Sequence, residues 1–317
     1  MKNKYLNILK YLSVLLIFFF IGKYIYININ ELKNIHISFN ICYLLSSIAV
    51  LLFYSLILIL IWHFITKKNN CNLNLKQSIV AKAYSNLGKY IPGKIGGLAI
   101  LFYFYKKENK PLKDLSVCVI TEAACSVLAS ILFFVFSLFF IPLPVFQKYR
   151  IVAILLLIVI FICINPKILE HIINFILKLA KKELIKINFT YKTILQITLM
   201  HVINFFIFGV SIFLFINSVY NIPVSRFIFI ISSFIFSSLI GFLAFFTPSG
   251  LGVREGMLIL LLKYIMPGSM AGILSITSRI LLVTNDLLLF FIVFLYSKNE
   301  PTPKRQNYVI PNLFRNL

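Results

Sequence analysis

The chain alternates long apolar runs with short polar segments, and most of the runs are as long as a membrane-spanning helix. A spanning helix needs about 20 mostly apolar residues. The runs that meet this length are roughly 8–28, 41–65, 115–141, 193–216, 224–246 and 270–296. The run 151–164 is shorter and would need its flanks to span. The pattern therefore predicts an all-α, polytopic membrane protein.

A first polar interruption, "SNLGKYIPGKIGG" at 85–97, would break any helix that contained it. Its composition predicts a helix to about Leu87, a break, and a second helix to Tyr105. Lysine clusters flank the segment on both sides, so both of its ends should face the cytoplasm. Segment 78–105 is therefore expected to be a re-entrant hairpin. Irregular backbone at membrane depth is tolerated only inside protein or along a watery cavity, so the break implies one of these.

A second interruption, "FFTPSGLGVREG" at 245–256, lies in the C-terminal half and precedes an apolar stretch too short to span. A second hairpin over 224–265, entering from the opposite side, gives six full spans and two opposed re-entrant hairpins, the pattern of an inverted repeat. If 224–246 instead spans fully, the count becomes eight. Either arrangement forms a single membrane domain over 1–300, followed by a short basic tail at 301–317.

Composition agrees with a protein dissolved in lipid. The chain is 60% hydrophobic and 13% charged, with a mean hydropathy of +0.95. The net charge of +22 comes from basic residues between the apolar runs, which form no nucleic-acid recognition module, so membrane lipids and not nucleic acid are the expected partners. Their distribution predicts a multi-pass protein of the cell (inner) membrane with N- and C-termini in the cytoplasm. The five cysteines have no metal-ligand spacing, so neither a metal nor a cofactor is expected.

The segment 167–186 carries apolar residues at helical spacing, with lysines gathered toward its end. This pattern is typical of an amphipathic helix at the cytoplasmic membrane surface. A solvated connecting helix packed on the protein is the alternative.

The two broken segments are the expected substrate site, because paired breaks in corresponding halves mark the binding site of many transporters. Each new half-helix exposes N–H groups and a partial positive charge at its N-terminus, which suits an anion such as phosphate. The predicted substrate-binding residues are Lys89, Pro92, Gly93, Lys94, Gly96, Gly97, Pro248, Gly250, Gly252, Arg254 and Glu255. In the alternative reading, the glycines and prolines only permit close helix packing, and Lys89 and Lys94 extend to the surface.

Ionisable residues inside the predicted spans are the candidates for gating or coupling: Glu122, Arg279 and Asp286. Arg279 and Asp286 are seven residues apart and share a helix face. An ion pair of Glu122 or Glu255 with Arg254 or Arg279 would hold the two halves together or gate a path, and the sequence alone does not assign the partners. His201 is expected to be a buried hydrogen-bonding residue.

The motifs "NLGKYIPGKIGG" and "TPSGLGVREG", with a later "TSRI", resemble the membrane-embedded half of the lysylphosphatidylglycerol synthase family and its stand-alone, flippase-like relatives. The resemblance covers nearly the whole chain in the order of the spans. It implies a role in moving aminoacylated phospholipids or lipid-linked glycan intermediates. By resemblance, Pro92, Gly93, Gly96 and Gly97 match the first motif, and Pro248, Gly250, Gly252, Arg254, Glu255 and Gly256 match the second.

Two features depart from the family pattern. The family often shows a Glu-Arg pair and then an Asp in the third span, whereas here Glu122 is followed by Ala123 and Ala124. The chain also continues for only 21 residues after Tyr296, so no soluble aminoacyl-transferase domain and no lipid aminoacylation are expected.

Three functions remain as hypotheses. The leading one is a non-enzymatic translocase for an anionic phospholipid or a polyprenyl-phosphate-linked glycan intermediate. The second is an accessory membrane subunit beside a partner enzyme of envelope lipid or glycan synthesis. The third, a glycosyltransferase using a lipid-phosphate sugar, is disfavoured because the first external loop offers only Glu31 as an acidic residue.

Overall fold

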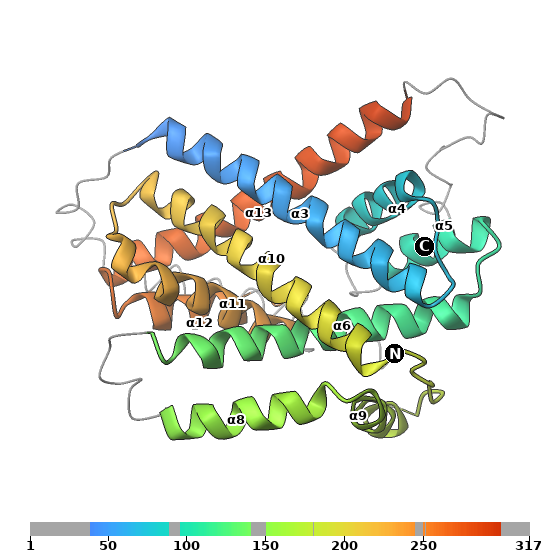
Figure 1. Ribbon diagram of the computed structural model, residues 1–317. Helices are drawn as coiled ribbons and strands as arrows, with labels where there is room; N and C mark the ends of the chain where they lie inside the picture. Colours follow the sequence, from blue (N-terminus) through green and yellow to red (C-terminus); the bar gives the residue numbers. More distant parts are fainter. Residues whose placement is uncertain are drawn as a thin grey trace, which may run out of the picture.

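The computed structural model describes residues 39–88, 96–140, 150–179, 181–244, 250 and 252–298. Over these residues the chain forms helices joined by turns and contains no strand (Figure 1). The helices are α3 (Ile41–Lys68), α4 (Leu75–Gly88), α5 (Gly96–Lys107), α6 (Leu112–Ser137), α8 (Arg150–Cys163), α9 (Pro166–Leu179), α10 (Tyr191–Asn217), the short 3-10 helix η1 (Val224–Arg226), α11 (Phe227–Leu243), α12 (Val253–Leu262) and α13 (Gly268–Lys298). The predicted all-α class is confirmed.

Five helices of the described part are long and apolar enough to cross a membrane: α3, α6, α10, α11 together with η1, and α13. They match the predicted runs, except that 8–28 lies outside the described residues. Side-chain caps set the starts of two of them. Asn40 Oδ1 accepts from the N–H groups of Cys42 and Tyr43 at the start of α3, and Thr190 caps α10 in the same way.

The two hairpins lie at opposite ends of the bundle (Figure 1). The N-terminal end of α3 lies beside the C-terminal end of α10, where Ser47 Oγ donates to the carbonyl of Ser211 over 2.8 Å and the N–H of Asn40 donates to the carbonyl of Ser218. The hairpin α4–α5 follows α3 and the hairpin α11–α12 follows α10. Because α3 and α10 run antiparallel, the hairpins enter the bundle from opposite sides.

The second arm of the later hairpin is too short to be a span. Helix α12 has 10 residues, or about 15 Å, against a hydrocarbon core of about 30 Å. It ends in a turn and is followed directly by α13. Helix α12 is therefore a half-helix, whereas α11 together with η1 has the length of a full span.

The packing repeats between the two halves. Each half consists of a span, a hairpin and a span: α3, α4–α5, α6 and then α10, α11–α12, α13. The first arm of each hairpin packs against the last span of the other half, α4 on α13 and α11 on α6, while α3 and α10 pack along each other at the centre. This exchange is the contact pattern of an inverted repeat.

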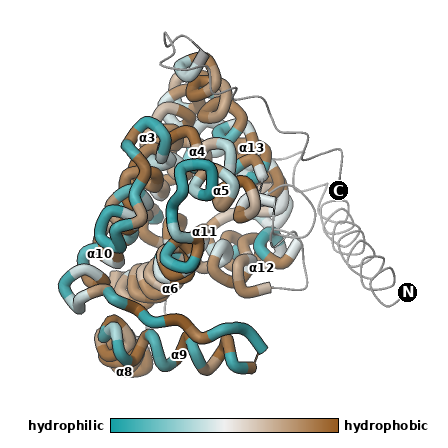
Figure 2. The backbone as a smooth tube through the Cα atoms, turned by 90° about the vertical axis from the view of Figure 1, so that its right-hand side faces the viewer, coloured by the Kyte–Doolittle hydropathy of each residue, from teal (hydrophilic) through white to brown (hydrophobic). Residues whose placement is uncertain are grey.

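Polar and apolar segments are arranged as expected for a protein in lipid. Figure 2 views the bundle from the end that carries α4 and α5, and hydrophilic segments gather there at the ends of α3, α5 and α10. One buried cluster centres near this end on Trp62, Tyr105 and Leu115. A second surrounds the other hairpin and includes Phe234 and Leu258.

Helix α9 turns away from α8 by 89°, so the short run at 151–164 is not continued into a straight span. An apolar stripe on α9 stays exposed, with Phe175, Ile176 and Leu179 at its centre. A stripe of this kind is typical of a helix lying in the membrane surface, which favours the interfacial interpretation over a packed connecting helix. The predicted helical extent to 186 was wrong, because α9 ends at Leu179.

Candidate functional site

A cavity of ≈ 600 Å³ lies between the two hairpins. Asn86, near the end of α4, lines it from one hairpin, and Gly241 and Arg254 line it from the other. Spans from both halves complete its wall, including Tyr54 of α3 and Asp286 of α13. A cavity, one of the two surroundings expected for the first broken segment, is therefore present, and both hairpins contribute to it.

One side of the cavity is charged. Arg254 at the start of α12, with Arg279 and Asp286 of α13, are the charged side chains among its described lining residues, which gives a net charge of +1. The prediction that Arg279 and Asp286 share a face is confirmed. Asn285 adds a buried acceptor, because its Oδ1 has no hydrogen-bond partner among the described residues, while its Nδ2 donates to Ser55 Oγ over 2.8 Å. This side offers cationic and polar groups to an anionic ligand.

The rest of the wall is largely apolar. Phe205 and Phe208 of α10 line the cavity, and the ring of Phe208 lies 5.2 Å from that of Tyr54. Phe242, at the end of α11, also lines the cavity and is 53% exposed, so the cavity wall reaches the outer surface of the bundle there. A cavity with one charged side and one aromatic side fits a molecule that is itself amphiphilic.

Arg279 is held in position by Glu255. Glu255 is 3% exposed; one carboxylate oxygen accepts from the N–H of Gly252 at the start of α12, and the other lies 3.4 Å from Arg279 Nη1. Glu255 with Arg279 is one of the pairings that the sequence left open. The pair joins α12 to α13 within one half, so it does not hold the two halves together.

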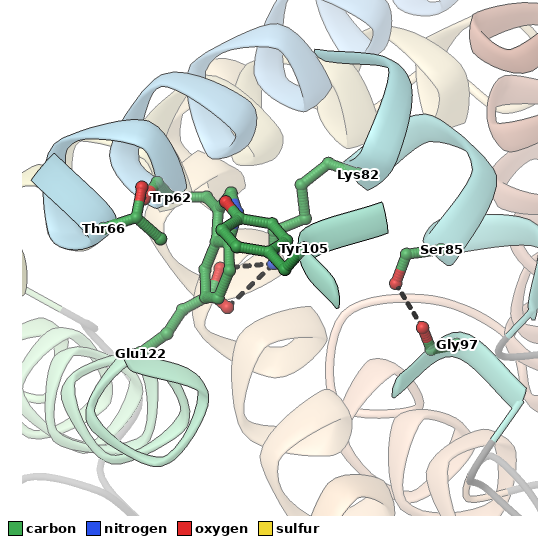
Figure 3. Close-up of polar contacts among 7 residues, drawn as sticks. All are labelled: Trp62, Thr66, Lys82, Ser85, Gly97, Tyr105 and Glu122. Carbon is green, nitrogen blue, oxygen red and sulfur yellow. Dashed lines mark hydrogen bonds and ion pairs between the residues drawn. The ribbon is translucent and has the colours of Figure 1, made fainter. Parts of the chain in front are cut away.

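Glu122 pairs with Lys82 and not with either predicted arginine. Lys82 Nζ lies 2.9 and 2.8 Å from the two carboxylate oxygens of Glu122, and 4.2 Å from the centre of the Trp62 ring. Figure 3 shows Lys82 extending from α4 past Trp62 and Tyr105 to the carboxylate on α6. Trp62 is itself fixed by a 2.8 Å hydrogen bond from its Nε1 to the hydroxyl of Tyr105.

Each ion pair joins a hairpin to the span that follows it. Lys82–Glu122 runs from the first arm α4 to α6, whereas Glu255–Arg279 runs from the second arm α12 to α13. Sequence reasoning counted Lys82 among the surface lysines and so missed its role. Its position inside an apolar stretch, "SIVAKAYSN", was the available signal.

Glycines let the arms of each hairpin approach closely at the inner end. A Cβ on Gly88 would lie 2.7 Å from the Cα of Gly97, and a Cβ on Gly250 would lie 2.5 Å from the carbonyl oxygen of Gly241. Ser85 Oγ also donates to the carbonyl of Gly97 over 2.8 Å (Figure 3). These contacts support the packing interpretation for Gly88, Gly97, Gly241 and Gly250.

The predicted binding residues thus divide into three groups. Arg254 lines the cavity beside Arg279 and Asp286. Gly96, Gly97, Gly250, Gly252 and Glu255 shape the hairpins and are not among its lining residues. Lys89, Pro92, Gly93, Lys94 and Pro248 lie outside the described residues. Tyr54, Asn86 and Asn285 were missed, although "SNLG" and "VTNDLLL" place the two asparagines next to features that the sequence singled out.

A family described as the lysylphosphatidylglycerol synthase TM region matches residues 7–289. The chain belongs to this family. The match covers both hairpins and the spans around them. The cavity described above therefore lies in a multi-pass membrane domain of a lipid-related family. Ala123, which follows Glu122, lines the cavity, and Lys82 supplies the cation beside Glu122. No curated protein and no solved structure matches the chain.

Proposed function

We propose that the protein is a non-enzymatic translocase that carries the headgroup of an anionic lipid through the cavity between its hairpins. The observation that supports this most is the cavity itself, which is lined by Arg254 and Arg279 together with Phe205, Phe208 and Phe242. A phosphate would interact with the arginines, and acyl or prenyl chains would lie against the apolar lining residues.

The charged groups in the wall favour an anionic headgroup. Two guanidinium groups, those of Arg254 and Arg279, line the cavity beside one lining carboxylate, that of Asp286. A phosphodiester carries a negative charge and accepts hydrogen bonds from guanidinium groups. A phospholipid and a polyprenyl-phosphate-linked glycan share this chemistry.

The two ion pairs suggest how access to the cavity would alternate. Lys82–Glu122 lies toward the cytoplasmic side in the predicted orientation and Glu255–Arg279 toward the other. Breaking one pair would free its hairpin to tilt while the other pair stays closed, as expected for an inverted repeat.

Lipid movement can be measured in liposomes that contain a fluorescent phosphatidylglycerol and an external quencher. The matched variants are Arg254→Gln, in the cavity, and Lys263→Gln, an exposed cation at the other end of α12. We expect Arg254→Gln to slow movement by about ten-fold, equivalent to about 1.4 kcal/mol, and Lys263→Gln to leave it unchanged. Wild-type liposomes no faster than empty ones, or equal rates in wild type and Arg254→Gln, would contradict the proposal.

Cysteine labelling in cells tests the proposed orientation, in which both termini lie on the cytoplasmic side of the cell (inner) membrane. Cys42 is exposed at the end of α3 that should face outward, whereas Cys71, Cys118 and Cys125 are buried. A membrane-impermeant maleimide added to intact cells or spheroplasts should label the wild-type protein, and Cys42→Ser should abolish that labelling. Labelling of Cys42 only after the membrane is opened would reverse the orientation.

A further inference from the structure

Three buried polar side chains lie outside the site described so far: Thr121 on α6, and His201 and Asn204 on α10. His201 is 2% exposed, and the other two are fully buried. Thr121 Oγ1, both ring nitrogens of His201 and both side-chain amide atoms of Asn204 have no hydrogen-bond partner among the described residues. Each buried polar group of this kind is unfavourable by about 1–3 kcal/mol unless a water or ligand satisfies it.

These side chains lie on two helices that pack against each other, α6 and α10. Thr121 precedes Glu122 of the ion pair on α6, and the charges of Glu122 and Lys82 both act on His201. The His201 ring lies 6.2 Å from that of Phe205, one turn further along α10, which lines the cavity. Asn204 lies one helical turn before Phe208, another lining residue, on the same face of α10.

The chemistry of the cluster suits water and a proton better than a metal ion. Thr121 and Asn204 provide two side-chain oxygens, fewer than the hard cations usually require. Buried waters typically make about three hydrogen bonds to polar groups that lack other partners. Neutral imidazole offers one donor and one acceptor nitrogen, so a histidine can accept a proton on one side and release one on the other.

Glu122 and Lys82 are the charged groups that most directly affect the protonation of His201. The other helices packed against α10 contribute Tyr54 from α3, and Arg279 and Asp286 from α13, all of which line the cavity. Helix α11 has no charged side chain. Protonation of His201 is therefore electrostatically linked to the ion pair on one side and to the cavity on the other.

We propose that Thr121, His201 and Asn204 hold a chain of buried waters along which a proton passes between the Lys82–Glu122 pair and the cavity, with His201 as the proton carrier. A proton that binds one ring nitrogen gives the imidazolium, and the proton on the other nitrogen then leaves. No covalent bond to carbon changes, and nothing is oxidised or reduced. The proton site stands by itself, whereas its coupling to lipid movement rests on the proposed function.

The proton site can be tested without any lipid assay. The chain has four histidines, so a protein labelled with [15N]histidine gives few signals, which single His→Gln variants assign one at a time. If His201→Gln does not fold, substitution of the other three assigns its signal. We expect the His201 signal to titrate reversibly between about pH 5 and 8.

Glu122→Gln separates a relay from a buried histidine that merely packs. Without the carboxylate, the protonated fraction of His201 at a given pH should fall by about three-fold or more, while the signal of exposed His171 on α9 should be the same in both proteins. A His201 signal that does not move while the protein remains folded, or that titrates identically in Glu122→Gln, overturns the proton site.

Coupling is tested in the liposomes, with the membrane potential held at zero by valinomycin and potassium. A gradient of about one pH unit should change wild-type phosphatidylglycerol movement by about three-fold, and His201→Gln should move lipid at a rate independent of the gradient. The coupling is overturned if the rate of lipid movement by the wild-type protein does not depend on the pH gradient, or if the rate in His201→Gln still depends on it. Absence of any lipid movement by the wild-type protein overturns the proposed function, and the histidine titration then decides the proton site alone.

Discussion

Replacing Gly250 by alanine tests the geometry of the second hairpin. Gly250 has φ +68°, a conformation that costs an L-residue about 1–2 kcal/mol. Its new Cβ would lie 2.5 Å from the carbonyl oxygen and 2.7 Å from the Cα of Gly241. These are backbone atoms, so no side-chain rotation relieves the overlap, and the hairpin arms must separate at a further cost of about 1–3 kcal/mol. Gly250→Ala should therefore lower the unfolding free energy by about 2–5 kcal/mol.

Gly256 is the matched control, one turn into α12. A Cβ there meets nothing within 4 Å, and alanine in a helix interior is favoured over glycine by about 0.5–1 kcal/mol. The two variants should thus change stability in opposite directions.

Thermal unfolding can be followed with a thiol-reactive dye, because Cys118 and Cys125 are buried and become reactive when the bundle opens. Gly250→Ala should lower the melting temperature by at least about 4 °C, and Gly256→Ala should raise it or leave it unchanged. The close approach at the inner end of the hairpin would be refuted if Gly250→Ala had the melting temperature of the wild type. It would also be refuted if Gly256→Ala lowered the melting temperature as much as Gly250→Ala does.

Three further results are expected. Lys82→Met and Glu122→Gln should each lower the free energy of unfolding by about 2 kcal/mol, a value between those of exposed and fully buried ion pairs. Lys113→Met, at an exposed position of α6, should leave it unchanged. A double variant that exchanges the charges at positions 82 and 122 and regains no stability would argue against the pairing. Gly88→Ala should lower the melting temperature, because its Cβ would lie 2.7 Å from backbone atoms of α5, and an unchanged melting curve would show that the first hairpin is more open. Asp286→Asn should raise the affinity for short-chain phosphatidylglycerol by about ten-fold in a thermal-shift titration, since the cavity gains positive charge, and equal affinities would remove Asp286 from the ligand's surroundings.

The spans and the hairpin breaks could be predicted because both depend on local physics. An apolar run of spanning length must satisfy its backbone as a helix, and segments such as 88–97 and 245–256 cannot continue one. The end of α9 was mispredicted, since apolar spacing continues beyond it. The chain leaves the helix near Lys181, which has φ 52°, and the following backbone bonds to side chains of α9 at Glu170 and Asn174.

The pairing of charges could not be predicted, because it depends on how each helix is rotated about its axis. Helix α6 is apolar on nearly all sides, so nothing in its sequence shows which face Glu122 occupies or that Lys82, 40 residues earlier, lies opposite. Arg279 and Glu255 could be proposed as partners only among several choices. The cavity residues Tyr54 and Asn86 come together for the same reason, from elements whose relative placement only the folded structure fixes.

The environment of Trp62 gives the molecule a built-in optical reporter. It is the chain's single tryptophan, fully buried, with the Lys82 ammonium over its ring. Indole emission responds to a nearby charge and to entry of water, so any tilt of α4 that separates Lys82 from Glu122 would change the fluorescence of the unlabelled protein. Stopped-flow mixing with lipid or acid would then record the opening of the first hairpin in real time, in a native chain that carries no dye and no substitution.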